Sequence, residues 1–582
     1  MPPKSTLNPE SKGSKTKTIF LVLSVLVAIL LIGAIVIVAK NSSFFRGSDN
    51  HYEGLSELEA NRLLNELYKT INVTTLPPIN ENVDSESMTM MEILPEIDQF
   101  PLAVSPISGT LWLELFSSSE KATDSENGTY NRWLMTMGKK FNALKPSIKG
   151  QPVSIAIRPI PSGLAMDYIA SGKHVPDAFS PSNVLWGEAL RAQGLPVKLM
   201  AEKLVGNVAG IVIKNSKIES FLKKYQKISV DTVVKAVNDE TFIMGYANPL
   251  VSSTGANFLM SLLCETNPND PLSSEAVASF EKFQRNIPFV AYTTLQMTQA
   301  AKSGLFDGFV FEYQQFANSP ELKKDYTFTP FGVRHDNPVY ALRNPSREKI
   351  ELLTMFIAYC NFPESQKLAL DYGFNQNADY PGVGQIKGQY LTEALKLYKA
   401  RKSGDREVMA VLVADNSGSM EGPSIRLLKR SLIQGSKAIN SNNFVGLVLF
   451  SDQTQIAVPI NKFDLTQRSI FAGAVNNMSV GGGTAMYDAI IVAAKMLQDA
   501  KAKYPRVKPI IIVLTDGDSD QGHTFQDIAQ VMRGLKIPIH TIGYKADIKA
   551  LKDISAINEA ATMKADIDDI VYQMQSFFAA EM

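Results

Sequence analysis

The sequence is poor in cysteine and histidine. Only two cysteines, Cys264 and Cys360, and five histidines are spread over 582 residues. This scarcity excludes a disulfide-rich scaffold, an iron–sulfur cluster and a His-rich zinc site, and it leaves room for at most one disulfide.

An excess of charge of either sign is also missing. The chain carries 58 Lys and Arg against 58 Asp and Glu, so it lacks the strongly basic surface of a dedicated nucleic-acid-binding protein. With 45% hydrophobic and 20% charged residues, the composition is that of a folded globular protein. Its length suits about three to four domains of ordinary size.

Long apolar runs are absent except for one, at residues 19–39. Its 21 residues carry no charge, and at about 1.5 Å per residue a helix of this length crosses a ~30 Å hydrocarbon core. We predict a transmembrane helix. The alternative, a cleaved signal peptide, has an apolar core of about 7–15 residues and a small-residue cleavage site, and this segment has neither.

The flanks of this run predict its orientation. Four lysines precede it, whereas Lys40 and Arg46 are the only basic residues just after it. Because positive flanks stay in the cytoplasm, we expect residues 1–18 inside and the chain from about residue 40 outside. The sequence therefore predicts a single-pass protein of the cell membrane whose bulk is extracytoplasmic.

Composition and periodicity divide the remainder. Residues 40–99 read as a stalk with one amphipathic helix, which we expect to pack onto the domain that follows it. Residues 100–385 form a first large α/β region, 386–407 a charged helical connector, and 408–582 a second α/β region.

The second region alternates apolar β-branched runs with helical patterns. The runs at 408–415, 445–450, 510–516 and 537–543 are continuously apolar, as in a parallel sheet buried on both faces. We therefore predict a doubly wound sheet, on which ligands gather beyond the carboxyl ends of the strands.

Oxygen-bearing side chains cluster at these strand ends. Asp415, Ser417 and Ser419 follow the first strand, Thr484 follows a glycine-rich turn, and Asp516 ends the strand at 510–516. Hydroxyls combined with carboxylates suit Mg²⁺ or Mn²⁺, which take octahedral oxygen coordination. The alternative is that these residues are ordinary helix caps and turns.

The pattern D-x-S-x-S, a later Thr and a strand-end Thr-Asp-Gly resembles the metal-ion-dependent adhesion site of von Willebrand factor type A domains, over about residues 404–582. The resemblance implies a Rossmann-like fold in which the two serines and the threonine offer hydroxyls to the metal. The two aspartates would hold the ion directly or through water, and an Asp or Glu of a partner protein would fill the remaining position.

Electrostatics agree with that use. A cation held mostly by neutral hydroxyls keeps much of its charge uncompensated, so it attracts an incoming carboxylate. We expect Asp518 and Asp520 to shape the charge of the loop, and His523 to be a solvated loop residue and not a ligand.

The first region resembles bacterial extracellular solute-binding proteins. The segments that carry the likeness, in family order, are 109–120, 174–190, 248–263 and 343–374. The resemblance implies two α/β lobes of the type II periplasmic-binding-protein kind, with a ligand cleft between them.

Hydroxyls at strand ends and helix starts are the candidates for that cleft. The run that starts at Ser252 precedes an apolar helix, whose free N–H groups receive anions well. Plain helix capping is the alternative for each serine, and core or hinge packing for the tyrosine. The candidate ligand-binding residues are Ser117, Ser118, Ser180, Ser182, Ser252, Ser253, Thr254 and Tyr313.

No catalytic motif is found: the sequence has no G-x-S-x-G, H-E-x-x-H or G-x-x-x-x-G-K-[ST]. We therefore predict a binding protein and not an enzyme: a membrane-anchored adaptor that docks a protein partner through the metal and senses or holds a small-molecule or anionic ligand in the cleft. The alternative is the receptor subunit of an ABC-type uptake transporter with an accessory adhesion-type domain.

Overall fold

A computed structural model describes most of the chain beyond residue 54. It covers residues 55–81, 94–123 without 95, 129–291 without 288, and 306–555 without 385, 402–406, 438, 518 and 545–548. Residues 297, 301, 562–565, 574 and 578 complete the described part. No helix in these ranges is long and apolar enough to cross a membrane, and the predicted membrane segment 19–39 lies outside them. Cys264 and Cys360 are both unpaired thiols.

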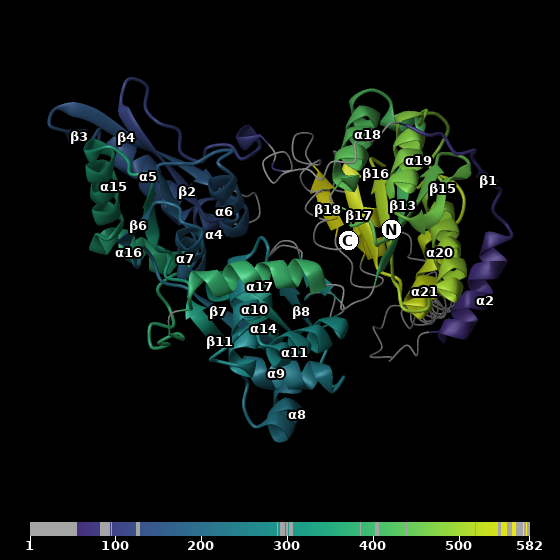
Figure 1. Ribbon diagram of the computed structural model, residues 1–582, viewed down its shortest axis with the longest axis horizontal. Helices are drawn as coiled ribbons and strands as arrows, with labels where there is room; N and C mark the ends of the chain where they lie inside the picture. The colour runs from purple at the N-terminus through teal and green to yellow at the C-terminus, as the bar shows by residue number, and fades with distance from the viewer. Residues whose placement is uncertain are drawn as a thin grey trace, which may run out of the picture. The chain divides into compact units, whose positions relative to one another are not determined.

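The C-terminal domain is built on a seven-stranded sheet (Figure 1). The four apolar runs predicted as strands form parallel pairs at its centre, as expected. Only three residues join β14 to β15, too few for a parallel crossover, so β15 runs antiparallel and the predicted parallel sheet ends there. In spatial order the strands are β1 (Val73–Thr75), β15 (Thr454–Lys462), β14 (Phe444–Phe450), β13 (Val408–Asp415), β16 (Lys508–Thr515), β17 (Ile539–Tyr544) and β18 (Thr562–Ala565).

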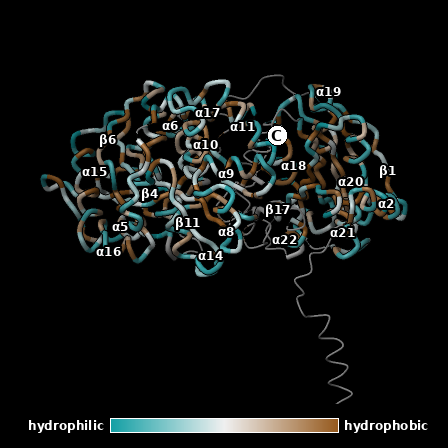
Figure 2. Tube along the Cα trace, turned by 90° about the horizontal axis from the view of Figure 1, so that it is seen from below, coloured by the Kyte–Doolittle hydropathy of each residue, from teal (hydrophilic) through white to brown (hydrophobic). Residues whose placement is uncertain are grey.

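Helices cover both faces of this sheet. Alternate residues of β13 divide between two hydrophobic clusters, with Val411 and Val413 in one and Ala410 and Leu412 in the other. The doubly wound arrangement predicted from continuous apolar strands is therefore confirmed. The first face carries α20 (Met486–Lys503), α21 (Phe525–Leu535) and α22 (Lys549–Ser555), and the second carries α18 (Pro423–Ser436) and α19 (Leu465–Asn476). In Figure 2, the trace around α20 has the brown colour of hydrophobic residues.

Residues 55–81, far away in sequence, belong to this domain, and we call them the N-terminal clasp. Helix α2 (Glu57–Tyr68) packs on α20 and α21, as Figure 1 shows. Its Ala60 and Leu64 are buried in the cluster of the first face. Gly534 of α21 permits the close approach, because a Cβ there would lie 2.6 Å from that of Ala60.

The clasp then passes around the edge of the sheet. Strand β1 pairs in parallel with β15, from Val73 opposite Thr454 to Thr75 opposite Ile456. Beyond it, the Ser469 hydroxyl of α19 donates to the carbonyl of Glu81 at 2.7 Å. The segment therefore contacts one face of the sheet, its edge strand and a helix of the other face.

The clasp corrects one prediction. The amphipathic helix expected in the stalk is present, but the expectation that it packs onto the next domain in sequence is wrong. Its leucine stripe marks a buried face without saying which surface buries it. That surface is the C-terminal domain, which starts more than three hundred residues later in the chain.

The first large region consists of two lobes, each with its own sheet, as the resemblance implied. Lobe A contains the six-stranded sheet and lobe B the five-stranded one. In spatial order the strands of lobe A are β3 (Ser147–Ile148), β4 (Gln151–Pro159), β2 (Leu111–Ser117), β5 (Ala178–Ser180), β12 (Val339–Leu342) and β6 (Val197–Ala201). Those of lobe B are β11 (Tyr326–Arg334), β7 (Val208–Lys214), β10 (Gly308–Glu312), β8 (Met244–Ala247) and β9 (Phe289–Ala291).

Helices flank both sheets. Lobe A carries α4 (Ser119–Ala122), α5 (Trp133–Ala143), α6 (Ser162–Ser171), α7 (Val184–Ala192), α15 (Arg347–Cys360) and α16 (Pro363–Asp371). Lobe B carries α8 (Asn215–Tyr225), α9 (Val230–Asn238), α10 (Ser253–Thr266), α11 (Ser274–Arg285), α13 (Tyr313–Ala317) and α14 (Pro320–Asp325).

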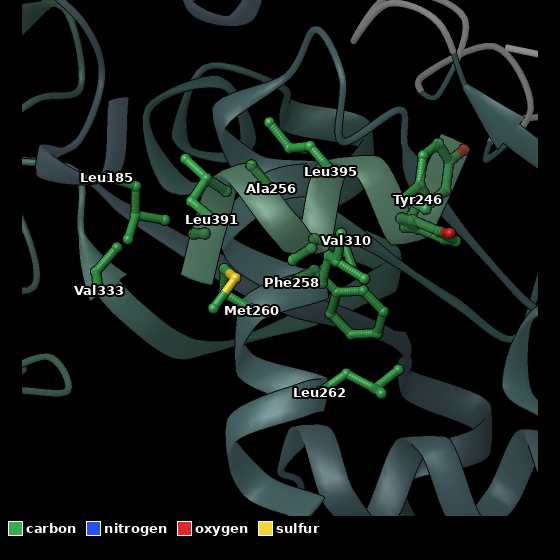
Figure 3. Close-up of a cluster of buried hydrophobic side chains, with 14 of the residues drawn as sticks. Leu185, Tyr246, Ala256, Phe258, Met260, Leu262, Val310, Val333, Leu391 and Leu395 are labelled. Carbon is green, nitrogen blue, oxygen red and sulfur yellow. The ribbon is translucent and has the colours of Figure 1, made fainter. Parts of the chain in front are cut away.

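The chain crosses between the lobes twice, from β6 to β7 and from β11 to β12. The two crossings lie side by side, since the N–H of His335 donates to the carbonyl of Asn207 at 3.0 Å. A third link is the predicted connector helix, α17 (Gly388–Arg401), which packs on α7 of lobe A and α10 of lobe B. Its Leu391 and Leu395 lie in a hydrophobic cluster shared by both lobes (Figure 3).

Candidate functional site

The carboxyl ends of β13 and β16 bring four of the five predicted metal residues together. The Ser417 and Ser419 hydroxyls are 3.0 Å apart, and Ser419 donates to Asp516 Oδ1 at 2.7 Å. The Ser417 N–H donates to Asp415 Oδ1 at 2.8 Å. Because β13 and β16 are parallel neighbours, residues a hundred positions apart in sequence share this edge.

Thr484 joins this edge through its backbone. Its N–H donates to Asp520 Oδ1 at 2.7 Å, and its carbonyl accepts the N–H of Asp520 at 3.0 Å. The turn before it is tied to the D-x-S-x-S loop, since the Gly418 N–H donates to the carbonyl of Gly482 at 3.0 Å. Asp520, expected only to shape the charge of the loop, thus fixes the position of the Thr484 backbone.

His523 differs from its expected role as a solvated loop residue. Its Nδ1 lies 2.6 Å from Asp488 Oδ1, and its backbone N–H donates to the same oxygen at 2.9 Å. Its Nε2 is 3.2 Å from the Thr70 hydroxyl at the end of α2. The histidine therefore links the loop that follows Asp516 to the clasp, a contact that no local pattern indicates.

Asp415 is the charged centre of the candidate site. Its side chain is fully buried, and burial, together with the nearby Asp516, raises its pKa although hydrogen bonds from Ser417 and Thr515 oppose this. Two close carboxylates, one of them fully buried, form a site that a divalent ion would stabilise.

The donor set fits a hard cation. No group of three or more His, Cys, Asp or Glu side chains among the described residues could hold a metal ion. The candidate site instead offers two carboxylates and a set of hydroxyls, of which Ser419 is exposed. Such oxygens suit Mg²⁺ or Mn²⁺, and with so few carboxylates the ion would keep positive charge for a further anion.

Most of the predicted cleft hydroxyls are engaged within the chain, but the buried Ser180 Oγ has no hydrogen-bond partner among the described residues. Trp186 Nε1 of lobe A donates to Ser253 Oγ at 2.8 Å, and Ser252 Oγ caps α10 by accepting the Gly255 N–H. Thr254 Oγ1 donates to Glu312 Oε1 at 2.9 Å. Ser252 therefore acts as a helix cap, which was the alternative considered from the sequence.

The remaining cleft candidates lie in lobe A, apart from the tyrosine. Ser117, Ser118, Ser180 and Ser182 are all buried at the ends of β2 and β5. The ring of Tyr313 packs against Phe316 and Phe328 in the hydrophobic cluster of lobe B, which is the packing role considered as its alternative.

Lys121 is a residue that sequence reasoning missed. Its ammonium is fully buried, donates to Ser118 Oγ and to the Ser180 carbonyl, the latter at 2.9 Å, and lies 3.9 Å from Glu120 Oε1. Burial lowers the pKa of Lys121 to about 8, although Glu120 and Glu312 act to raise it. The sequence could have indicated this contact, because Lys121 follows Ser118 by three residues and a helix places residues at that spacing on one turn.

The buried lysine predicts a pH effect on stability. Between about pH 8 and the ordinary value of 10.5, the unfolded chain binds this proton and the folded chain does not, so the free energy of unfolding should rise with pH. The full shift corresponds to about 3 kcal/mol. Chemical denaturation at about pH 8 and about pH 10 should show about 2 kcal/mol of this gain relative to Lys121→Met, because each pKa lies close to or beyond one end of the interval. Lys140→Met, at an exposed lysine, is the control, and equal slopes in all three chains would contradict the prediction.

Known protein families match both large regions of the chain. Residues 127–375 match the family of the bacterial extracellular solute-binding protein, and residues 410–580 match the von Willebrand factor type A domain. Inter-alpha-trypsin inhibitor heavy chain H1 of Mesocricetus auratus is 26% identical over 183 residues, 29% of this chain and 20% of that relative. An uncharacterized protein of Borreliella burgdorferi is 29% identical over 148 residues, 24% of this chain and 41% of that relative. The matches thus span well under half of these relatives.

Solved structures give matches of the same two kinds. Iron-bound HitA from Pseudomonas aeruginosa is 15% identical with a TM-score of 0.35, covering 50% of this chain and 99% of that one. A von Willebrand factor type A structure from Catenulispora acidiphila is 21% identical with a TM-score of 0.28, covering 30% of this chain and 43% of that one. The two family matches show that the chain carries a bacterial extracellular solute-binding protein domain followed by a von Willebrand factor type A domain.

Proposed function

We propose that this chain is a membrane-anchored adaptor that docks a protein partner through a divalent metal held by its von Willebrand factor type A domain. The ion, Mg²⁺ or Mn²⁺, would be held by Ser417, Ser419 and Thr484, with Asp415 and Asp516 binding it directly or through water. The partner would supply an Asp or Glu carboxylate to the remaining position.

The observation that carries this proposal is the hydrogen-bonded set formed by the two serines and two aspartates. Ser419 and Asp516 lie at its outer side, where a partner has access, whereas Asp415 is buried beneath them. When bound, the ion supplies a localised positive charge that attracts an anionic side chain. This chain's residues fix the position of that charge, because three loops are bonded to one another around it.

The proposal is tested by affinity capture from membranes with the purified chain, in Mg²⁺ and in chelator. We expect a partner that is retained only with Mg²⁺ or Mn²⁺. Replacing the partner's acidic residue by its amide should abolish retention, because an amide carries no negative charge. Equal capture with and without the metal would contradict the docking mechanism.

A localisation follows from the same proposal. With residues 19–39 in the membrane and the basic flank inside, protease added to intact, wall-stripped cells should digest the chain beyond residue 40. Digestion only after the cells are disrupted would show the opposite orientation. A cytoplasmic protein probed in the same samples is the control for leakage.

An uptake receptor remains the second candidate, on the strength of the solute-binding domain. A receptor opens and closes around a solute, so its cleft must offer free polar groups to that solute. Here Ser253, Thr254 and Ser252 are bonded to groups of the chain itself, which favours the adaptor, and Ser180 Oγ is a buried hydroxyl without a partner among the described residues. A small solute that binds saturably in the cleft would favour the receptor.

A further inference from the structure

The two lobes touch directly across the predicted cleft. The N–H of Gly163 in lobe A donates to the carbonyl of Val251 in lobe B at 3.2 Å. Ser253 of lobe B accepts the indole N–H of Trp186 at 2.8 Å, and its carbonyl accepts Asn183 Nδ2 at 3.4 Å. A Cβ on Gly163 would lie 2.1 Å from the carbonyl oxygen of Leu250. The lobes are therefore in direct contact at these residues.

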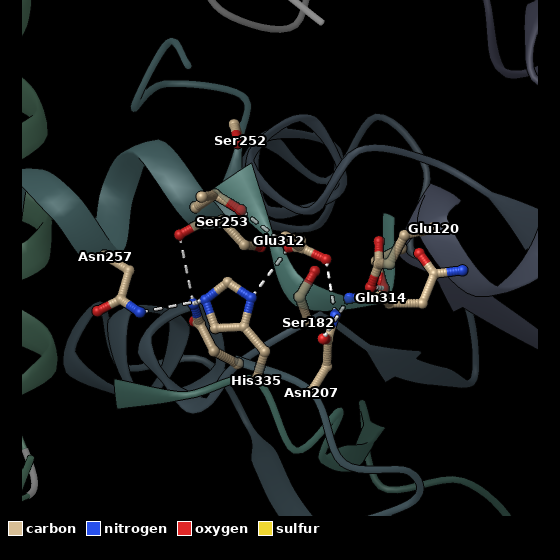
Figure 4. Close-up of polar contacts among 12 residues, drawn as sticks. Glu120, Ser182, Asn207, Ser252, Ser253, Asn257, Glu312, Gln314 and His335 are labelled. Atoms are coloured by element: carbon tan, nitrogen blue, oxygen red, sulfur yellow. Dashed lines mark hydrogen bonds and ion pairs between the residues drawn. The ribbon is translucent and has the colours of Figure 1, made fainter. Parts of the chain in front are cut away.

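A carboxylate of the chain itself lies next to this contact, bonded to the residue that follows Ser253. Glu312, the last residue of β10, is 7% exposed and accepts three hydrogen bonds, each of 2.9 Å (Figure 4). The donors are Thr254 Oγ1 in the first turn of α10, Asn207 Nδ2 and His335 Nδ1. Asn207 and His335 belong to the two crossings, so one carboxylate bonds a lobe B helix and both interlobe segments.

The surrounding amides determine the form of His335. Its Nε2 lies 3.1 Å from Asn183 Nδ2 and 3.2 Å from Asn257 Nδ2. Both amides have their oxygens committed to backbone N–H groups, of Leu185 and Val333, so both present N–H to the ring. Nε2 must therefore accept and Nδ1 must donate, which makes His335 neutral and leaves Glu312 as the anion.

Lys121 contributes positive charge near this anion, while its ammonium donates to Ser118 Oγ and to the Ser180 carbonyl. Burial acts to raise the pKa of Glu312, whereas the hydrogen bonds from His335 and Thr254 and the positive charge of Lys121 act to lower it, and the pKa lies below its ordinary value. Glu312 in turn acts to raise the pKa of the fully buried Lys121. A buried carboxylate that accepts three hydrogen bonds and lies near a cation meets the conditions under which a buried charge is tolerated.

We propose that Glu312 is the resident anion of this cleft and occupies the position that an external anionic solute would need. The contacts between the lobes are made by groups of the chain itself, and the solute-binding domain acts as a closed, self-ligated body. Thr254, a predicted ligand residue, binds this internal carboxylate instead. The inference does not depend on metal-dependent docking and stands if docking fails.

The experiment replaces the internal carboxylate by an external one. Glu312→Ala removes a –CH₂–COO⁻ group, which acetate matches in size and charge. The full-length purified chain is melted in sodium acetate and in sodium chloride at equal ionic strength. We expect Glu312→Ala to melt several degrees below the wild type in chloride, and acetate to recover more than half of that loss with saturation. The wild type should melt alike in both salts.

Two further variants distinguish the effect of losing the negative charge from a general loss of stability. Glu312→Gln keeps the shape of the side chain but removes its charge. Because the glutamine fills the space that Glu312→Ala leaves for acetate, acetate should not raise the melting temperature of Glu312→Gln. Glu312→Ala with Lys121→Met removes both charges, and should fold without responding to acetate. If Glu312→Ala alone does not fold in chloride, folding in acetate is the expected result.

Three outcomes would overturn the proposal. The first is equal melting, or an equal failure to fold, of Glu312→Ala in acetate and chloride. The second is an acetate response in Glu312→Gln as large as in Glu312→Ala. The third is saturable binding of sulfate, phosphate, molybdate or acetate to the wild-type cleft by calorimetry, because a cleft filled by its own carboxylate has no place for these anions.

Discussion

Replacing Asp415 by asparagine should abolish the stabilisation of the chain by Mg²⁺ and, with it, the capture of the partner. At about 100 times its dissociation constant, a bound ion raises the free energy of unfolding by about 2.7 kcal/mol. Loss of a carboxylate at the centre of the site should weaken metal binding at least ~100-fold, since even outer groups of metal sites contribute about 10- to 100-fold. Differential scanning calorimetry with and without Mg²⁺ measures the loss.

Asparagine is the informative replacement because it keeps the shape of a fully buried side chain. Its oxygen can still accept the Ser417 N–H, and the Thr515 hydroxyl has a second acceptor in the Gly517 carbonyl at 3.2 Å. Since Asp415 and Asp516 repel each other, the metal-free variant should be at least as stable as the metal-free wild type. An unchanged Mg²⁺ response in Asp415→Asn would contradict the assigned site.

Thr484→Ala is the companion variant in the same titration. The contacts that hold Thr484 in place are made by its backbone N–H and carbonyl, so the loop should keep its conformation. The substitution removes one hydroxyl and should weaken partner capture more than metal binding. If Thr484→Ala behaves as the wild type in both measurements, its hydroxyl has no role at the metal.

Leu64→Ala in the N-terminal clasp should destabilise the C-terminal domain by about 2–5 kcal/mol, the usual cost of truncating a buried leucine. Leu64 is 1% exposed and lies in the cluster formed with α20 and α21. The affected residues are hundreds of positions away in sequence, so the effect should be seen as earlier exchange of amide hydrogens in α20, α21 and β15.

Leu58 provides a matched control on the same helix. It is 82% exposed, so Leu58→Ala should change the free energy of unfolding by no more than about 0.5 kcal/mol. Both substitutions replace leucine by alanine in α2, and helix propensity therefore cancels between them. Equal effects of the two variants, or an effect of Leu64→Ala confined to α2, would show that the C-terminal domain is stable without the clasp.

The core of the C-terminal domain could be predicted from the sequence because each of its strands is indicated by a short, continuous stretch of residues. A strand buried on both faces needs a continuous apolar run, as at residues 408–415, and parallel strands end at one edge. The D-x-S-x-S motif and Asp516 follow two such strands, so the pattern of residues alone was enough to predict that they meet. The likeness to the von Willebrand factor type A domain rested on the same short motifs.

Pairing between distant segments was decided only by the tertiary structure. The leucines of α2 mark an apolar face, but the same stripe would suit many surfaces, and only packing selects α20 and α21. The three residues of β1 are β-branched and suit a strand, but so short a run indicates neither that a strand forms nor that β15 is its partner. The contact between His523 and Thr70 likewise depends on where α2 packs.

For the cleft, too, some residues could be predicted from the sequence and others only from the tertiary structure. Ser252, Ser253 and Thr254 were identifiable from the sequence, since hydroxyls before an apolar helix indicate exposed N–H groups. Whether such groups receive a solute or a side chain of the same protein depends on what the other strands bring to them. Glu312, Asn207 and His335 come from three separate segments, and only the fold brings them together. Hydrogen bonding and burial at that meeting point, and not any local pattern, determine that the anion there is the chain's own.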